Sequence, residues 1–224
     1  TPGLEPFICD PDSEQRLSDG QVGEICIVGH SVSAGYWQRP DSTAEAFRPA
    51  HVQQTPWPRF FRTGDLGFML EGELYVSGRV KDLIILNGVN HHPGDIECSV
   101  LRAHEGFRPD GAAAFSIDMD DGERLVVVQE VERRAVRGLD VAKVLGEIRA
   151  ALWQQHRLAQ PWLLLVSGGT LPRTSSGKVR RQDCRRLFGA YLQALAAGEA
   201  VPLQQRVIAV EQGGQLRVEQ GSPQ

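Results

Sequence analysis

Apolar and polar residues alternate over short distances in the first 78 residues, and turn-forming residues interrupt the alternation. Residues 6–29, PFICDPDSEQRLSDGQVGEICIVG, contain two β-rich segments separated by Asp-Pro, Ser-Asp-Gly and Gly signals, and residues 72–78, GELYVSG, form a third between glycines. Residues 39–48, RPDSTAEAFR, place hydroxyl side chains before an Ala-Glu-Ala-Phe run, which is typical of a short capped helix. Residues 51–67, HVQQTPWPRFFRTGDLG, are expected to form a loop. The pattern predicts a small β-rich module, such as a distorted barrel.

After Arg79 the pattern changes to strands that alternate with helices, which is typical of α+β units. Strands are expected at residues 82–88 (DLIILNG), 111–118, 123–131 and 161–168, and helices at residues 92–104, 139–156 and 180–198. The helix at 139–156 places one apolar face toward the sheet through Val141, Val144, Leu145, Ile148 and Leu152. The tail from Glu199 lacks firm periodicity, although residues 206–210 and 215–218 could pair as a weak hairpin.

Composition and charge limit the kinds of partner. The 224 residues are 41% hydrophobic, which is enough for a real core, and 24 Lys and Arg against 28 Asp and Glu give a formal charge of −4. This balance excludes a whole-chain basic field that would hold nucleic acid or an anionic membrane. No apolar stretch reaches the roughly 18 residues of a membrane span, and no signal peptide is recognisable. Because the chain begins at Thr1 and enters directly on strand-like sequence, we expect it to be a piece of something longer.

The four cysteines, Cys9, Cys26, Cys98 and Cys184, are far apart in the sequence. They form no C-x-x-C pair and have no companion histidine at zinc-ligand spacing. We therefore expect reduced thiols in a cytosolic protein, with no metal site.

Residues 168–188, GGTLPRTSSGKVRRQDCRRLF, join a Gly-, Pro- and Ser-containing loop to a basic helix. Such residues are common in ordinary surface connections, because each favours a turn conformation for its own reason. The functional alternative is a mobile loop that carries Lys178 into an anionic site, where its ammonium acts as a point charge on a phosphate or carboxylate. Local chemistry leaves both interpretations open.

Four strings occur in order along the chain: GEICIVGHSVSAGYW, FRTGDLG, GRVKDLIILNG and LPRTSSGKVRR. Together they resemble the adenylate-forming superfamily, and the chain is most similar to the C-terminal part of fatty-acyl-AMP ligases, over residues 1 to about 195. The resemblance implies an ATP- and Mg²⁺-dependent ligase that activates a fatty acid as acyl-adenylate and passes it to the phosphopantetheine thiol of an acyl carrier protein. The family's upstream phosphate loop and acyl pocket have no counterpart in this sequence, so the fragment is expected to be inactive without the missing N-terminal part.

The resemblance also implies roles for individual residues. Lys178 matches the lysine that bridges the carboxylate and the α-phosphate, so it is the expected catalytic residue. Asp65 matches the acidic residue that accepts hydrogen bonds from both ribose hydroxyls, although a turn-capping Asp would suit the same sequence. Arg79 matches the arginine that contacts the ribose or phosphate. Lys81 aligns with the hinge, and Gly88 with the glycine of the loop that lines the thiol tunnel, where the lack of a Cβ allows close approach.

The implied organisation is α+β. Residues 1–78 would be a β-rich subdomain of the large N-terminal domain, 79–82 the hinge, 83–195 the mobile C-terminal α+β domain and 196–224 a tail. The resemblance implies that the C-terminal domain rotates about this hinge, with one pose for adenylation and another for thiol transfer, and a few residues are enough to absorb such a torsion change.

Departures from the wider family favour one branch and leave alternatives. Where CoA synthetases and peptide-synthetase adenylation domains usually read G-x-R-I-E, this chain reads GVNHHPGDIE. The missing motif argues against an acyl-CoA synthetase or an amino-acid adenylation domain, and a non-catalytic module that docks a carrier protein stays open. We reject a metal site at His91 and His92, because adjacent side chains diverge and no third ligand is near. The basic run Arg180, Arg181, Arg185 and Arg186 is interpreted either as a docking face for an anionic carrier protein or as a solvated helix surface.

Overall fold

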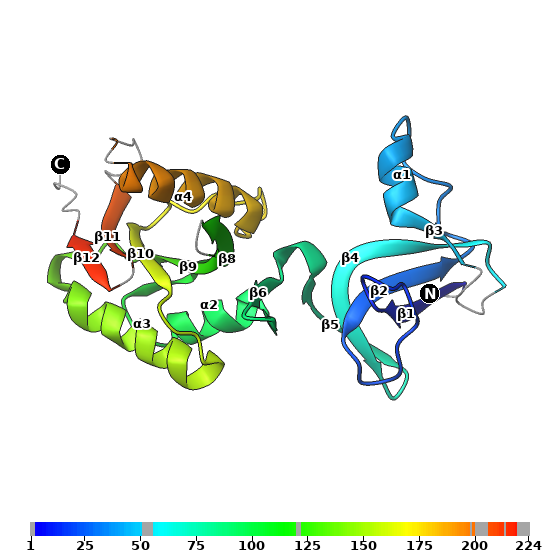
Figure 1. Cartoon of the computed structure of the whole chain (residues 1–224), viewed down its shortest axis with the longest axis horizontal. Helices are drawn as coiled ribbons and strands as arrows, with labels where there is room; N and C mark the ends of the chain where they lie inside the picture. Colours follow the sequence, from blue (N-terminus) through cyan, green and yellow to red (C-terminus); the bar gives the residue numbers. More distant parts are fainter. Residues whose placement is uncertain are drawn as a thin grey trace. The chain divides into compact units, whose positions relative to one another are not determined.

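The structure is a computed structural model that describes residues 3–50, 56–119, 122–197, 199, 206–212 and 214–218. The chain divides into two compact units, Thr1–Lys81 and Asp82–Gln224 (Figure 1). The predicted mixed α+β class is confirmed: the described residues form four α-helices and three β-sheets. None of the described helices has the length and apolar character needed to cross a membrane.

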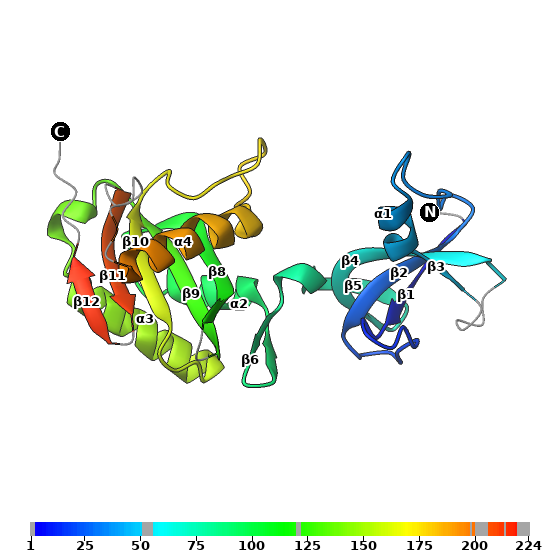
Figure 2. The same ribbon diagram turned by 45° about the horizontal axis from the view of Figure 1, so that its top comes forward.

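The first unit is a curled antiparallel sheet with one short helix (Figure 2). Its strands run in the order β1-β2-β4-β3, and β5 pairs with β4. The elements are β1 (Leu4–Cys9), β2 (Gly23–Gly29), α1 (Pro40–Ala46), β3 (Phe47–Pro49), β4 (Arg59–Leu70) and β5 (Glu73–Arg79). The sheet curls as a half-barrel around a core of buried residues that includes Phe7, Cys26, Val28 and Phe60. Phe7 and Phe60 meet edge to face with ring centroids 5.7 Å apart.

Two local expectations for this unit are corrected. The segment 59–67, expected to be part of a loop, belongs to β4, which pairs with β2, β3 and β5. The alternation of apolar and polar residues did not indicate a strand here, because β4 contains charged residues. Their partners lie on neighbouring strands and are adjacent only in the folded sheet. Residues 51–55 of the same expected loop lie outside the described residues. The predicted helix exists, but it begins at Pro40 with no side-chain cap. A proline suits the first helical turn, because its missing N–H has no helical acceptor there.

The second unit is built on a five-stranded sheet with helices on both faces (Figures 1 and 2). The strand order is β12-β11-β10-β9-β8, and β9 and β10 are parallel while the other pairs are antiparallel. The strands are β8 (Phe107–Met119), β9 (Gly122–Val131), β10 (Trp162–Ser167), β11 (Val207–Gln212) and β12 (Gln215–Val218). The helices are α2 (Pro93–Leu101), α3 (Val141–His156) and α4 (Arg181–Ala196), with short 3₁₀ turns at Val80–Asp82 (η1) and Val136–Gly138 (η2).

Alternation along the strands explains the two cores of this unit. In β9, Leu125 and Val127 pack with α2 and α3 on one face, whereas Val126 and Val128 pack with α4 on the other. Successive side chains of a strand point to opposite faces, so an apolar run such as LVVV is buried on both sides. The predicted face of α3 is confirmed by the burial of Val144, Leu145, Ile148 and Leu152. Asp140 caps this helix by accepting a hydrogen bond of 3.1 Å from the Lys143 amide.

At the two ends of the second unit, the observed elements differ in extent or role from those that the sequence predicts. Residues 82–88, expected as one buried strand, contain only β6 (Ile84–Leu86), which pairs with β7 (Val89–His91) in a tight hairpin. The turn residues Asn87 and Gly88 both have positive φ, and an Asn-Gly pair is the usual solution for such a turn. The weak hairpin predicted in the tail is confirmed as β11 and β12. The segment 196–224 therefore supplies two strands of the main sheet, because β11 pairs with β10.

Candidate functional site

Asp65 and Arg79 lie opposite each other on β4 and β5. Arg79 Nε is 3.1 Å from Asp65 Oδ1, and the two side chains are 71% and 38% exposed. An exposed pair of this kind contributes only about 0–1 kcal/mol to stability. Both groups therefore remain accessible, and a ligand that offers hydroxyl donors and anionic oxygens can compete for them at little cost.

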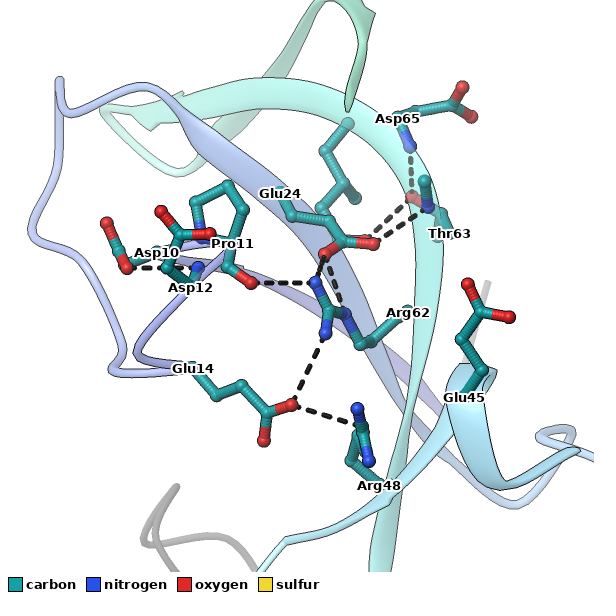
Figure 3. Close-up of polar contacts among 12 residues, drawn as sticks. Asp10, Pro11, Asp12, Glu14, Glu24, Glu45, Arg48, Arg62, Thr63 and Asp65 are labelled. Carbon is teal, nitrogen blue, oxygen red and sulfur yellow. Dashed lines mark hydrogen bonds and ion pairs between the residues drawn. The ribbon is translucent and has the colours of Figure 1, made fainter. Parts of the chain in front are cut away.

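The backbone that carries Asp65 is held by a network of hydrogen bonds (Figure 3). Thr63 Oγ1 donates to the Ile25 carbonyl at 2.7 Å and accepts a hydrogen bond from the Asp65 amide at 3.1 Å. Gly64, between them, has a φ of +73°, a conformation that favours glycine. The T-G-D segment is thus a fixed bend within β4, and the Asp65 carboxylate projects from it.

The buried carboxylate of Glu24 also stabilises this bend, through hydrogen bonds to Gly64 and Arg62. Glu24 on β2 is 3% exposed, and its Oε1 accepts a hydrogen bond of 3.0 Å from the Gly64 amide. Its Oε2 accepts from Arg62 Nε at 2.7 Å and lies 2.5 Å from Arg62 Nη2 (Figure 3). Sequence reasoning missed both residues. The only signal for Glu24 was a charged residue within the otherwise apolar strand sequence GEICIVG.

The network continues outward from Arg62. Its guanidinium donates to the Pro11 carbonyl at 2.9 Å and to Glu14 Oε1 at 3.3 Å. Glu14 also forms an ion pair of 3.1 Å with Arg48 (Figure 3). Arg62 thereby joins the loop after β1 to the bend that carries Asp65.

Glu24→Gln is expected to lower the free energy of unfolding by about 1–3 kcal/mol, because Arg62 and the Gly64 amide lose a charged acceptor. Urea unfolding of the chain measures this, with the exposed Glu5→Gln on β1 as the matched control. Equal stability of the two variants would contradict a supporting role for Glu24.

Lys178 lies at the end of a tight turn in the second unit. The Thr174 amide donates to the Lys178 carbonyl at 2.8 Å, and the Lys178 amide donates to Thr174 Oγ1 at 3.1 Å. Gly177 has a φ of +86°, and its amide donates to the Thr174 carbonyl at 2.9 Å. The Lys178 side chain is exposed, and no ion pair joins it to another residue of the described part of the chain. The segment is therefore an ordered turn that presents a cation to solvent.

Lys81 is the last residue of the first unit and lies in η1. Its ammonium is 3.9 Å from Glu45, and both side chains are largely exposed. The hinge role stays a prediction. Gly88 occupies the β6–β7 turn with a φ of +76°, and a Cβ there would meet no described atom within 4 Å. Its positive φ, rather than close packing, is what requires glycine within this unit.

Arg181 connects three segments of the second unit. Its guanidinium forms a bidentate pair with Glu97 on α2, with distances of 2.7 and 2.6 Å, and lies 3.6 Å from Asp82. Hydrogen bonding with Glu97 holds the pKa of Arg181 above its ordinary value. Glu97 also accepts a hydrogen bond of 3.0 Å from the Ala114 amide on β8, and Gln182 donates to Asp82 at 3.1 Å. Arg181 therefore ties the start of α4, directly after the Lys178 turn, to the first residue of the unit.

We expect Arg181→Ala to destabilise the second unit by about 2 kcal/mol, because Glu97 and Asp82 lose a charged donor in a partly buried setting. Arg185→Ala on the same helix is the control and should cost less than about 0.5 kcal/mol. Urea unfolding followed by tryptophan fluorescence compares them. Similar losses would show that Arg181 is an ordinary surface residue.

The other arginines of the basic run also have intramolecular partners. Arg180 lies 2.7 Å from Asp183, Arg186 pairs with the same carboxylate, and Arg185 lies 3.6 Å from Asp118. These pairs offset much of the positive charge of the run. The docking-face interpretation consequently applies to Arg180, Arg185 and Arg186 at most, since Arg181 has a structural role.

The four cysteines are free thiols, three of them buried and one exposed. Cys9 and Cys26, distant in sequence, are neighbours on β1 and β2: their thiols hydrogen-bond, and this contact together with burial raises the pKa of Cys26. Burial raises the pKa of Cys184 to about 12, which makes it a poor nucleophile at neutral pH. Burial and the nearby His156 lower the pKa of His91. In the described ranges, no group of three His, Cys, Asp or Glu side chains could hold a metal ion.

The chain is similar to a family model and to curated ligases. The model of the family "Disco-interacting protein 2-like, AMP domain" matches residues 81–194. The medium-chain-fatty-acid–[acyl-carrier-protein] ligase JamA of Moorena producens is 41% identical over 186 residues, which cover 83% of this chain and 31% of JamA. The long-chain-fatty-acid–AMP ligase FadD32 of Mycolicibacterium smegmatis is 38% identical over 222 residues, which cover 86% of this chain and 35% of FadD32. The chain spans about a third of the length of these relatives.

The fold of the chain is also similar to that of a solved structure. The crystal structure of ATP-bound MatB from Rhodopseudomonas palustris superposes with a TM-score of 0.65 at 30% identity. The match covers 84% of this chain and 34% of MatB. The fold is therefore shared with a protein that binds ATP.

Proposed function

The chain belongs to the adenylate-forming superfamily, closest to its fatty-acyl-AMP and acyl-carrier-protein ligases, and on that premise we propose that it is the C-terminal part of a fatty-acyl-AMP ligase. The complete enzyme would use ATP to activate a fatty acid as acyl-adenylate. It would then transfer the acyl group to the phosphopantetheine thiol of an acyl carrier protein. The observation that carries the proposal is the accessible Asp65–Arg79 pair on a rigid bend, in a chain whose relatives are ligases of this kind.

The Asp65–Arg79 pair suits the nucleoside end of ATP. A carboxylate has two acceptor oxygens, and the ribose of ATP has two vicinal hydroxyl donors. Arg79, 3.1 Å from Asp65, has further N–H donors for a ribose or phosphate oxygen. The buried Glu24 and the partly buried Arg62 keep the bend fixed, so that little ordering is required when the nucleotide binds.

Lys178 has the charge needed at the reacting groups, which are the α-phosphate of ATP and the carboxylate of the fatty acid. In adenylation a carboxylate oxygen of the fatty acid attacks the α-phosphorus of ATP, the bond to pyrophosphate breaks, and acyl-adenylate and pyrophosphate result. Both reactants are anions, and charge grows on the α-phosphate oxygens, so a cation between them stabilises the transition state. The exposed ammonium of Lys178, on an ordered turn, would supply that charge. Mg²⁺ would accompany the phosphates of ATP and neutralise part of their charge.

In the second half-reaction the carrier's thiolate attacks the acyl carbonyl, and AMP leaves. The nucleophile in this step belongs to the carrier. We propose that the second unit moves between the two half-reactions about Lys81, at the junction of the two compact units. The tight β6–β7 hairpin with Gly88 at its turn would line the path of the phosphopantetheine arm.

The choice of acceptor separates this function from that of an acyl-CoA synthetase. CoA brings a nucleotide with extra phosphates that need cationic contacts, whereas a carrier protein brings an acidic helix surface. The full-length protein that carries this chain is supplied with ATP, Mg²⁺, a fatty acid and either CoA or a holo carrier protein at equal thiol concentration. Mass spectrometry then follows the thioester. We expect thioester on the carrier, and comparable turnover with CoA would instead assign the protein to the acyl-CoA synthetases.

A further inference from the structure

Glu130 is a carboxylate buried completely within the second unit. It lies one residue before the end of β9, in the run LVVVQEV, and its side chain is 0% exposed. Burial of a charged group is costly unless hydrogen bonds and opposite charges compensate it, and well-packed apolar residues often stabilise a core equally well. The partners of Glu130 are therefore informative about why a charge is present.

The partners of this carboxylate in the described part of the chain lie at one end of the sheet. Its Oε1 accepts a hydrogen bond of 2.9 Å from the Leu171 amide, and its Oε2 lies 2.9 Å from Arg173 Nη2 and 3.4 Å from Arg108 Nη1. Leu171 and Arg173 belong to the segment that leads into the Lys178 turn. Glu130 thus anchors that segment to β9.

Arg173 connects Glu130 to the Lys178 turn through hydrogen bonds. Its Nη2 also donates to the Asp110 carbonyl at 2.9 Å, and its Nη1 donates to the Gly177 carbonyl at 2.9 Å. Gly177 directly precedes Lys178. One planar guanidinium therefore joins the buried carboxylate to the peptide group between Gly177 and Lys178, and such a fork fixes direction as well as distance.

We propose that Glu130 and Arg173 are positioning residues that hold the Lys178 ammonium at the reacting carboxylate and α-phosphate. The catalytic meaning of this inference rests on the proposed function. The anchoring of the turn by Glu130 and Arg173 does not. Neither residue touches the substrates, and both act through the backbone of the turn. Misplacement of a reacting group by about 1 Å can cost on the order of 10²-fold in rate, so the loss of this anchor is expected to slow adenylation although Lys178 is intact.

The first arm of the test measures the turn in the chain itself. Hydrogen exchange followed by mass spectrometry compares the wild type with Glu130→Gln, Arg173→Lys and the control Glu123→Gln, an exposed residue on the same strand. The two anchor variants should accelerate exchange at residues 174–178 while protection of the β9 core is kept. Arg173→Lys keeps a charge beside Glu130 but loses the fork, so it separates turn anchoring from burial of an unpaired carboxylate. Unchanged exchange at 174–178 in both anchor variants would overturn the inference.

The second arm measures the half-reactions in the full-length protein that carries this chain. Glu130→Gln should lower acyl-adenylate formation by about tenfold or more and leave transfer from pre-formed acyl-adenylate unchanged. In a Lys178→Ala background the same substitution should have no further effect on adenylation, since no ammonium remains to be positioned. Equal loss in both half-reactions, or an undiminished loss in the Lys178→Ala background, would assign Glu130 to general stability and overturn the inference.

The two arms also separate this inference from the proposed function. If the wild-type full-length protein forms no acyl-adenylate from any fatty acid, the proposed function fails, and with it the catalytic role of the anchor. The exchange experiment then still decides whether Glu130 and Arg173 fix the turn.

Discussion

Lys178→Ala in the full-length protein is expected to slow acyl-adenylate formation by on the order of 10²-fold or more, as loss of other preorganised electrostatic groups does. The ammonium acts while charge develops at the α-phosphate, and the thiol-transfer step does not involve that charge. Transfer from pre-formed acyl-adenylate should therefore proceed at close to the wild-type rate. Single-turnover measurements of the two half-reactions determine both rates separately.

The control for this variant is Lys143→Ala on α3, another largely exposed lysine of the second unit, which lies 3.9 Å from Glu147. It should leave both half-reactions unchanged. If Lys178→Ala slowed both steps equally, Lys178 would instead serve folding or docking of the second unit.

Asp65→Ala is expected to lower kcat/KM for ATP by about 10- to 100-fold, which corresponds to the loss of hydrogen bonds to a charged acceptor. The loss should be specific to the ribose: the wild type should prefer ATP to 2′-deoxy-ATP and 3′-deoxy-ATP, and the variant should lose most of that preference. Arg79 remains in the variant, so its contact with phosphate or ribose is not removed at the same time.

Asp19→Asn, an exposed acidic residue of the same unit, serves as the matched control and should keep the preference for ATP. Undiminished discrimination against the deoxynucleotides in Asp65→Ala would exclude Asp65 as the ribose acceptor. It would leave the T-G-D segment as a structural bend.

The spacing of apolar residues predicted the elements in which core-facing residues recur at one regular interval. The helix α3 and the strands β8, β9 and β10 are examples, because an apolar residue at each core-facing position is enough to specify them. The strand β4 was missed, because its sequence RFFRTGDLG contains charges whose partners lie on β2 and β5. A charged residue of this kind cannot be distinguished from a loop residue until its partners are known.

The candidate site divides in the same way. Lys178, Asp65 and Arg79 stand in motifs, so they could be proposed as site residues from the sequence alone. Glu24 and Glu130 were not, since each is a single charge in an apolar strand, and its meaning depends on a partner 38 or more residues away, Arg62 for Glu24 and Arg173 for Glu130. Likewise, the sequence separates Cys9 from Cys26, but the antiparallel pairing of β1 and β2 brings them together.

Fatty-acid-dependent exchange between ATP and pyrophosphate tests most directly whether this chain serves fatty-acid adenylation. The full-length protein is assayed with fatty acids of increasing chain length and with a panel of amino acids, and acyl-adenylate is identified by mass spectrometry. We predict exchange and acyl-adenylate with at least one fatty acid, none with amino acids, and none from the 224-residue chain alone, which spans only a third of its relatives. Exchange driven by amino acids, absence of exchange with every fatty acid, or full exchange by the isolated chain would contradict it.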